Sequence, residues 1–298
     1  MENTRKSITS RKTWMIFILF TETLISLATT IQAQEISEKG LSPTERHFLA
    51  AEKAPETARL FEARSYVSNL NDTIPYRLLK PLDYDPQKKY PLVVCLSGSG
   101  GRGSDNVKQI AGCWPAQVLS RQENRMKYPC FLFVPQCPPE ADWGVSFSER
   151  QKEKWVEAGY PLRRSIDSYV FAIISLLEKE FSIDPARRYV TGQSMGGSGS
   201  WHYILTYQQM FAAAIPICGG ADPDLGQMII DTPIWAFHGQ KDDVAPVELS
   251  RNMIKAIKEA GGNPRYTEFP DANHFCWPLA YDTPGLLDWL FEQKRSIR

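Results

Sequence analysis

The stretch Arg188-Tyr-Val-Thr-Gly-Gln-Ser-Met-Gly-Gly197 decides the fold, because it joins a strand to a helix through a turn that contains a serine. Tyr189–Thr191 has the aromatic and β-branched residues that are typical of strands. Gly192-Gln-Ser194-Met-Gly196 matches the pattern GxSxG, and the residues that follow can continue as a helix. The glycines allow a sharp turn that exposes the serine hydroxyl. The segment predicts a strand–turn–helix elbow, and an ordinary glycine-rich turn is the alternative.

Apolar runs on both sides of this elbow predict further strands of one sheet. Continuous apolar runs are typical of parallel strands that are buried on both faces. The runs are Ser65–Val67 with Pro75–Lys80 as a hairpin-like pair, Pro91–Leu96, Phe131–Pro135, Ala212–Cys218, Ile234–Phe237 and Tyr266–Phe269.

Helical periods alternate with these strands. Apolar residues recur at helical spacing through residues 162–181, around Met253–Ile257 before Gly261-Gly262, and in Leu286–Phe291. The alternation predicts an α/β fold, with a mostly parallel twisted sheet and helices on both faces. We expect one domain over residues 65–298 and a polar lead-in over 34–64, with a short helix near Pro43–Lys53.

The first 33 residues read as a segment that is removed. A basic start is followed by an apolar run from Trp14 and by small residues around Ala28–Ala33, the order found in secretory signal peptides. A membrane anchor is the alternative, but Thr21-Glu22-Thr23 interrupts the run well short of the ~20 apolar residues that a span needs. We therefore expect cleavage near Ala33, an exported protein, and no membrane span in the mature form.

Composition narrows the function classes. The 298 residues include 34 Lys+Arg, 34 Asp+Glu and 43% hydrophobic residues, which is typical of a globular chain. The balanced charge gives no reason to expect nucleic-acid binding. Export would permit disulfides, but the six cysteines are sparse, and Cys130 and Cys137 flank one strand at about 20 Å, too far to bond. One bridge with an unreadable pairing stays open, and no metal or organic cofactor is expected.

A second glycine run, Gly98–Gly103, follows the strand Pro91–Leu96 and matches GxGxxG. This pattern alone would suggest a dinucleotide pyrophosphate at a helix N-terminus. The fingerprint also needs an acidic residue about 20 residues later, at the end of the next strand. Here the next strand ends at Pro135-Gln-Cys137, more than thirty residues away and without an acid. Nucleotide binding is therefore disfavoured.

A serine hydroxyl needs a base to take its proton, and the chain has four histidines. His47 precedes the sheet, His202 lies two turns along the helix after Ser194, and His238 precedes the expected acid. His274 follows the last strand, and active groups of open α/β sheets gather at the carboxyl ends of strands. We therefore predict His274 as the base.

The acid should lie between serine and histidine in this chain order. Asp242 and Asp243 leave the strand Ile234–Phe237, and Asp242 is the first choice with Asp243 in reserve. Either could instead cap the helix that starts near Pro246. Asp222 and Asp224 follow the preceding strand and are weaker candidates.

Together, these residues resemble the α/β-hydrolase superfamily. The chain is more narrowly similar to exported bacterial carboxylesterases and predicted peptidases, which are related to feruloyl and acetylxylan esterases and to polyhydroxybutyrate depolymerases. The resemblance spans about residue 65 to the end and rests on four segments: Tyr90–Gly100, Gly192–Gly197, Ile234–Val247 and Tyr266–Trp277. It implies Ser194 as nucleophile, Asp242 as orienting acid and His274 as base.

The resemblance also implies an oxyanion hole made by the backbone N–H groups of Met195 and Ser99, which gives the Gly98–Gly103 run a second meaning. Ser97 departs from the family pattern His-Gly-Ser-Gly, in which a histidine stands at this position. That histidine is not the base, so catalysis should survive, but the hydrogen bonds that anchor the loop are expected to differ.

The substrate is less constrained than the chemistry. Residues 137–162 form a polar insertion with the aromatic residues Trp143, Phe147, Trp155 and Tyr160, which could either stack on a sugar or pack the insertion onto the domain. Trp143, Gln193 and Trp277 are candidate substrate-binding residues. We expect a serine esterase acting on acylated carbohydrate or small esters. An exported peptidase of the prolyl-oligopeptidase type and a non-catalytic binding protein are the rivals. The sequence carries no signal for the oligomeric state.

Overall fold

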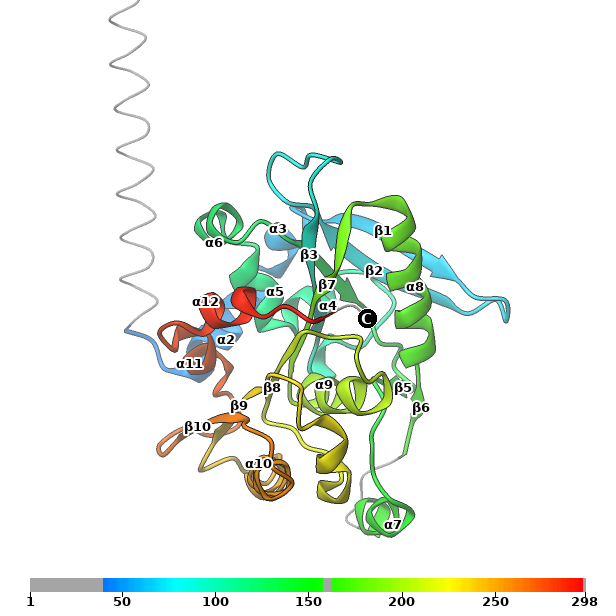
Figure 1. Ribbon diagram of the computed structural model, residues 1–298. Helices are drawn as coiled ribbons and strands as arrows, with labels where there is room; N and C mark the ends of the chain where they lie inside the picture. Colours follow the sequence, from blue (N-terminus) through cyan, green and yellow to red (C-terminus); the bar gives the residue numbers. More distant parts are fainter. Residues whose placement is uncertain (1–39, 158–161, 297–298) are drawn as a thin grey trace, which may run out of the picture. The chain divides into compact units, whose positions relative to one another are not determined.

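The computed structural model describes residues 40–157 and 162–296 (Figure 1). The chain divides into two units at Arg46. In the described part of the first unit, Ser42 precedes helix α2 (Pro43–Glu52), and its amide N and Oγ each lie 2.7 Å from the Glu45 carboxylate, as in a capping box. The signal peptide predicted for residues 1–33 lies outside the described residues.

The unit that begins at His47 is built on one twisted sheet. Eight strands of the described residues follow the spatial order β1-β2-β4-β3-β7-β8-β9-β10. The pairs β1–β2 and β2–β4 are antiparallel, and the other pairs are parallel. The strands are β1 (Glu62–Val67), β2 (Thr73–Leu79), β3 (Tyr90–Leu96), β4 (Phe131–Pro135), β7 (Ile183–Gln193), β8 (Ala213–Ile217), β9 (Trp235–Gly239) and β10 (Arg265–Phe269).

Helices cover both faces of this sheet, as the sequence predicts. Alternate residues of β3 show the two layers, because Leu92 and Val94 pack into one apolar cluster and Val93 and Cys95 into the other. Figure 1 shows α8 and α9 on one side and α5, α11 and α12 on the other. The first layer contains α8 (Asp167–Glu180), α9 (Met195–Thr206) and α10 (Glu248–Glu259). The second layer contains α3 (Ala54–Ala58), α4 (Lys108–Ala111), α5 (Trp114–Leu119), α11 (Trp277–Asp282) and α12 (Leu286–Glu292).

Shorter elements connect these layers: α6 (Gln122–Lys127), α7 (Glu149–Glu157), and the 3₁₀ turns η1 (Ser99–Gly101) and η2 (Pro223–Ile229). The expected helix over 162–181 begins five residues late, at Asp167. The reason is a short parallel ladder between β5 (Ala141–Asp142) and β6 (Arg164–Ser165), which keeps the chain extended before the helix. The sheet itself begins at Glu62, within the segment expected to be a lead-in.

The six cysteines are unbonded and buried in the core layers. Cys130 and Cys137 stand on either side of β4, as expected. Cys218, directly after β8, and Cys276, directly before α11, bring their Sγ atoms to 3.1 Å. No helix among residues 40–157 and 162–296 has the length and apolar character that crossing a membrane requires.

Candidate active site

The strand–turn–helix elbow is present at Ser194. β7 ends at Gln193 and α9 begins at Met195, and Ser194 between them has a φ of 56°, which is unusual for a residue other than glycine. A Cβ at Gly192 would lie 2.4 Å from the Gly196 carbonyl oxygen, and one at Gly196 would lie 2.1 Å from that of Leu96. Only glycine therefore allows the backbone to turn this tightly and present the Ser194 side chain.

Ser194, His274 and Asp242 lie in one hydrogen-bonded row. Ser194 Oγ is 2.9 Å from Nε2 of His274, and Nδ1 of the same ring is 2.8 Å from Oδ2 of Asp242. The three residues come from the ends of β7, β10 and β9, which are close together because parallel strands end at the same edge of the sheet. The arrangement can pass a proton from the hydroxyl to the ring while the carboxylate orients the imidazole.

Asp242, and not Asp243, faces the histidine. The Asp242 side chain is fully buried, whereas Asp243 is exposed. The Asp242 Oδ1 atom accepts hydrogen bonds from the backbone N–H groups of Val244 and Ala245 at 2.9 and 2.8 Å. Burial alone would raise the pKa of Asp242, but its contacts with His238, His274 and the Ala245 amide lower that pKa, so the carboxylate is ionised.

The His274 ring is tuned by the same contacts. Burial lowers the pKa of His274, but the hydrogen bond to Asp242 and the contact with the Cys218 sulfur outweigh burial and raise that pKa to about 9. Burial also raises the pKa of the Cys218 thiol, so this sulfur is uncharged near neutral pH. The Asp242 carboxylate is therefore the charge that favours a protonated His274.

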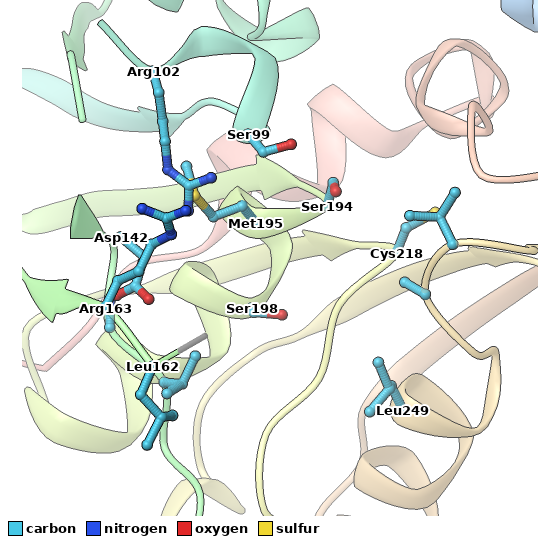
Figure 2. A pocket seen from close by; sticks show the side chains of 14 residues that line it. Ser99, Arg102, Asp142, Leu162, Arg163, Ser194, Met195, Ser198, Cys218 and Leu249 are labelled. Carbon is cyan, nitrogen blue, oxygen red and sulfur yellow. The ribbon is translucent and has the colours of Figure 1, made fainter. Parts of the chain in front are cut away.

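Met195 and Ser99, the two expected oxyanion donors, each stand at the start of a helical turn beside Ser194. Met195 is the first residue of α9 and Ser99 is the first residue of η1, and residues in a first helical turn have no carbonyl acceptor within their own helix. Both residues line the same pocket as Ser194 (Figure 2). These positions match the oxyanion donors that the sequence resemblance implies.

The loop after β3 is anchored by Trp143. The Trp143 indole N–H donates a hydrogen bond to the Ser97 carbonyl oxygen at 2.8 Å, while among the described residues the buried Ser97 hydroxyl has no partner. In this chain the Ser97 carbonyl oxygen, and not the Ser97 side chain, accepts the hydrogen bond that anchors the loop. Trp143 is fully buried, so it has no surface on which a sugar could stack, and the expectation that it binds substrate is wrong. An aromatic residue in a polar insertion can face either the core or the substrate, and the residue type alone does not decide between the two.

The other two proposed substrate contacts are also mostly buried. Gln193 is 1% exposed, and its Oε1 accepts a hydrogen bond from the Trp114 backbone N–H at 2.8 Å, which ties β7 to α5. Trp277 is 3% exposed and stands edge-on to the His274 ring at 5.5 Å. Both residues line a hollow beside Ser194. Their role as substrate contacts stays a prediction. The aromatic residues Trp155 and Tyr160 of the insertion lie outside the described side chains.

Two hollows meet at Ser194. One has a volume of about 250 Å³ and extends from Ser194 past Met195 toward Arg102 and Arg163, and Figure 2 shows this side. The other has a volume of about 400 Å³ and extends toward His47 and Trp277. Hollows on both sides of a nucleophile can hold the acid and the alcohol parts of an ester.

Two histidines, His47 and His238, lie at this site although the sequence did not predict them there. His47 accepts a hydrogen bond from the Trp277 indole at 3.3 Å, and burial together with the nearby His274 lowers the pKa of His47 to about 4, so it is neutral. His238 contacts Asp242 at 3.1 Å. The only feature of the sequence that could have indicated this contact is the position of His238 four residues before Asp242. His202 contacts Ser146 and Asp167, away from the row, as expected.

One set of side chains could in principle hold a metal ion. Ligand atoms of Cys218, His238 and Asp242 lie within 4.8 Å of one another. A thiol must lose its proton to bind a metal well, and burial holds the pKa of Cys218 far above neutrality. Asp242 already binds His274 and two amides. The donor set therefore fits an orienting network better than a metal site.

Comparisons with known proteins agree with this geometry. The Esterase family model matches residues 67–257. A solved structure described as a thermostable esterase is 40% identical, with a TM-score of 0.72, over 80% of this chain and 64% of that one. This likeness confirms the α/β-hydrolase fold that the sequence predicts.

Curated relatives are longer than this chain. "Uncharacterized peptidase YuxL" of Bacillus subtilis (strain 168) is 21% identical over 82% of this chain and 44% of its own length. The bifunctional acetylxylan esterase/xylanase XynS20E of Neocallimastix patriciarum is 30% identical over 30% of this chain and 14% of its own length. The chain therefore spans less than half the length of these relatives.

Proposed function

Since the chain belongs to the Esterase family, we propose that it is a serine esterase that hydrolyses carboxylic esters through a Ser194 acyl-enzyme. The observation that carries the proposal is the row Ser194–His274–Asp242, with contacts of 2.9 and 2.8 Å, at a strained elbow between two hollows. A serine in an ordinary glycine-rich turn would have no reason to meet a buried histidine and carboxylate in this order.

The reaction proceeds in two steps. Ser194 Oγ attacks the ester carbonyl carbon while His274 Nε2 takes the hydroxyl proton, and Asp242 stabilises the imidazolium. The ester C–O bond then breaks, and His274 returns the proton to the leaving alcohol. Water, activated by the same ring, hydrolyses the acyl-enzyme and regenerates Ser194.

The negative charge that develops on the carbonyl oxygen requires donors that are already in position. The N–H groups of Met195 and Ser99 are proposed to supply them. Each donor of this kind typically lowers the barrier by about 3 kcal/mol. Trp143 supports the Ser99 donor indirectly, because it fixes the Ser97 carbonyl two residues earlier.

The preferred substrate is proposed to be an acylated carbohydrate or a small ester, and the protein is proposed to act after export. The likeness to an acetylxylan esterase supports the first part, and the leader-like residues 1–33 support the second. A peptidase is the rival activity, because one relative carries that name.

The test is a panel of p-nitrophenyl esters with acetyl, butyryl, feruloyl and long-chain acids, given to the purified protein and to Ser194→Ala. We expect ester turnover by the wild type and its loss in Ser194→Ala with an unchanged melting temperature. Ser175→Ala is the matched control and should keep full activity, because Ser175 lies on α8, bonds the Phe171 carbonyl oxygen and lines neither hollow.

Three results would count against the proposal. Unchanged hydrolysis by Ser194→Ala would remove the nucleophile assignment. Cleavage of aminoacyl p-nitroanilides without ester turnover would favour the peptidase. No turnover and no labelling of Ser194 by a fluorophosphonate probe would favour a binding protein.

A further inference from the structure

Two arginines line the smaller hollow beside Ser194 without a carboxylate partner. Arg102 Nε donates a hydrogen bond to the Ala141 carbonyl oxygen at 2.9 Å, and an Arg163 terminal nitrogen donates to that of Pro139 at 2.8 Å. Among the described residues, no carboxylate oxygen lies within 4.0 Å of either guanidinium. These carbonyl contacts, with a further hydrogen bond between Arg102 and the Cys137 thiol, hold the side chains in place and neutralise neither charge.

The acidic residue that lines the hollow does not neutralise both arginines. Asp142 also lines it, but its Oδ1 accepts a hydrogen bond from the Gly144 N–H at 2.8 Å. Burial raises the pKa of Asp142, although Arg102, His202 and Arg163 act in the opposite direction. Two guanidinium cations therefore face a single carboxyl group, and the local charge is positive whether or not that group is ionised.

Most of the remaining lining of the hollow is apolar, with three serine residues among it. In Figure 2 both guanidinium groups point to the side where Asp142 and Met195 lie, while Ser194 and Cys218 lie farther along. The apolar lining comes from Val145, Leu162, Met195, Val244, Ala245 and Leu249. A group that fits this space has an apolar body next to the scissile carbonyl and an anion at its far end.

We propose that Arg102 and Arg163 form an anion-binding subsite that selects esters with a carboxylate on the acid or the alcohol part. The inference rests on the proposed function, because it names the substrate class of the same site. Guanidinium groups bind carboxylates through paired, charge-assisted hydrogen bonds, and holding two like charges close together is favourable when an anion lies between them. An acidic sugar would supply such a carboxylate from the alcohol side.

Matched substrates separate charge from shape. For the acid part, mono-4-nitrophenyl glutarate is compared with its neutral glutaramide analogue. For the alcohol part, 3-acetoxybenzoate is compared with 3-acetoxybenzamide. We expect the wild type to prefer the carboxylate in one of the two pairs by roughly tenfold in kcat/KM, mostly through KM, because the subsite binds a group that does not react. The preference should shrink as salt is added.

Variants assign the preference to these side chains. Arg102→Gln and Arg163→Gln should each reduce the preference, and Arg102→Lys should keep part of it. Arg59→Gln, an exposed position that does not line the hollow, removes the same charge from the chain and should change nothing. Melting temperatures of all variants show whether any loss comes from unfolding.

The outcomes distinguish this inference from the function on which it rests. Turnover of both members of each pair at equal rates, or an unchanged preference in both arginine variants, would overturn the subsite and leave the esterase intact. If no ester is turned over, the esterase fails, and calorimetry then tests the subsite alone. Ser194→Ala should bind glutarate more tightly than glutaramate, or 3-hydroxybenzoate more tightly than 3-hydroxybenzamide, and equal binding within both pairs overturns the inference.

Discussion

His274 shows how one residue sets the working pH of the site. Only the neutral ring can take the Ser194 proton, and its pKa is raised to about 9, so the active fraction grows with pH. We expect kcat/KM to rise about tenfold per pH unit well below this pKa and to level off near pH 9. Asp242→Asn should move the rise to lower pH, because the favourable charge is lost, while lowering kcat. A flat profile between pH 6 and 9 would contradict this assignment.

His238 belongs to the same network from the other side of Asp242. Its Nε2 lies 2.9 Å from the Ala245 carbonyl oxygen and 3.1 Å from Asp242 Oδ2, and both oxygens accept, so this nitrogen carries a proton. His238 is fully buried, and Nδ1 contacts Ser250 Oγ at 2.8 Å. We interpret it as a positioning residue that shares the Asp242 carboxylate with His274.

His238→Leu should lower kcat roughly tenfold with little change in KM, because a charge-assisted hydrogen bond that orients the carboxylate is lost. The rise of kcat/KM with pH should move to higher pH, since Asp242 then acts on His274 alone and raises the pKa of that ring further. His238→Gln, which keeps a donor, should change less. A purely structural role would lower stability and leave the pH profile where it is.

The sequence predicts the positions of the three residues in the row, because the order of strands alone places them. Ser194, Asp242 and His274 each leave the carboxyl end of a strand, and parallel strands bring such ends together. Arg102 and Arg163 could not be predicted, because their positions depend on carbonyl groups of Ala141 and Pro139 that are distant in sequence.

At the scale of elements, the insertion between β4 and α8 acts as a support for the loop after β3. Trp143 follows β5, fills the space next to Gly199 of α9, and holds the Ser97 carbonyl. Trp143→Phe should cost about 1 kcal/mol of stability and lower kcat, because the donor is lost while most of the volume stays. Trp143→Ala should cost about 3–5 kcal/mol. Urea unfolding and ester kinetics measure both, and full activity in Trp143→Phe would contradict the supporting role.

Two unbonded thiols lie close together between the end of β8 and the start of α11, and oxidation can test this proximity. Cys218 and Cys276 are buried with Sγ atoms 3.1 Å apart. A diazene oxidant such as diamide should convert both thiols into one disulfide, losing two hydrogen atoms to the reagent, which becomes a hydrazine. Mass spectrometry of the digest should find this link. Thermal unfolding of the intact oxidised protein should show a raised melting temperature. Cys130 and Cys137, separated by β4, are the internal control, and a link between them instead would contradict the structure.

Element boundaries show where sequence patterns stop being informative. The apolar period that predicts a helix from residue 162 continues through a segment that pairs as β6, because Arg164 and Ser165 find partners in β5. Such a ladder depends on two segments meeting, which a periodicity in one of them does not report. The strands buried on both faces, β3 and β4, were predictable to within a residue, because continuous apolar runs have few alternatives.

At the scale of the whole molecule, the layers follow from the alternation of strands and helices, and residues 1–33 predict that the protein is exported. When the full chain is expressed in a bacterial host, we expect the protein in the periplasm or medium to begin after Ala33, because a basic start, a short apolar run and small residues direct export and cleavage. The mature chain would keep 30 of the 34 basic and 32 of the 34 acidic residues, and so would be slightly acidic. Intact mass and N-terminal sequencing of each fraction measure this. A chain that keeps Met1 and stays with the membrane would instead favour the anchor, and a chain starting at residue 34 that remains inside the cell is the matched control.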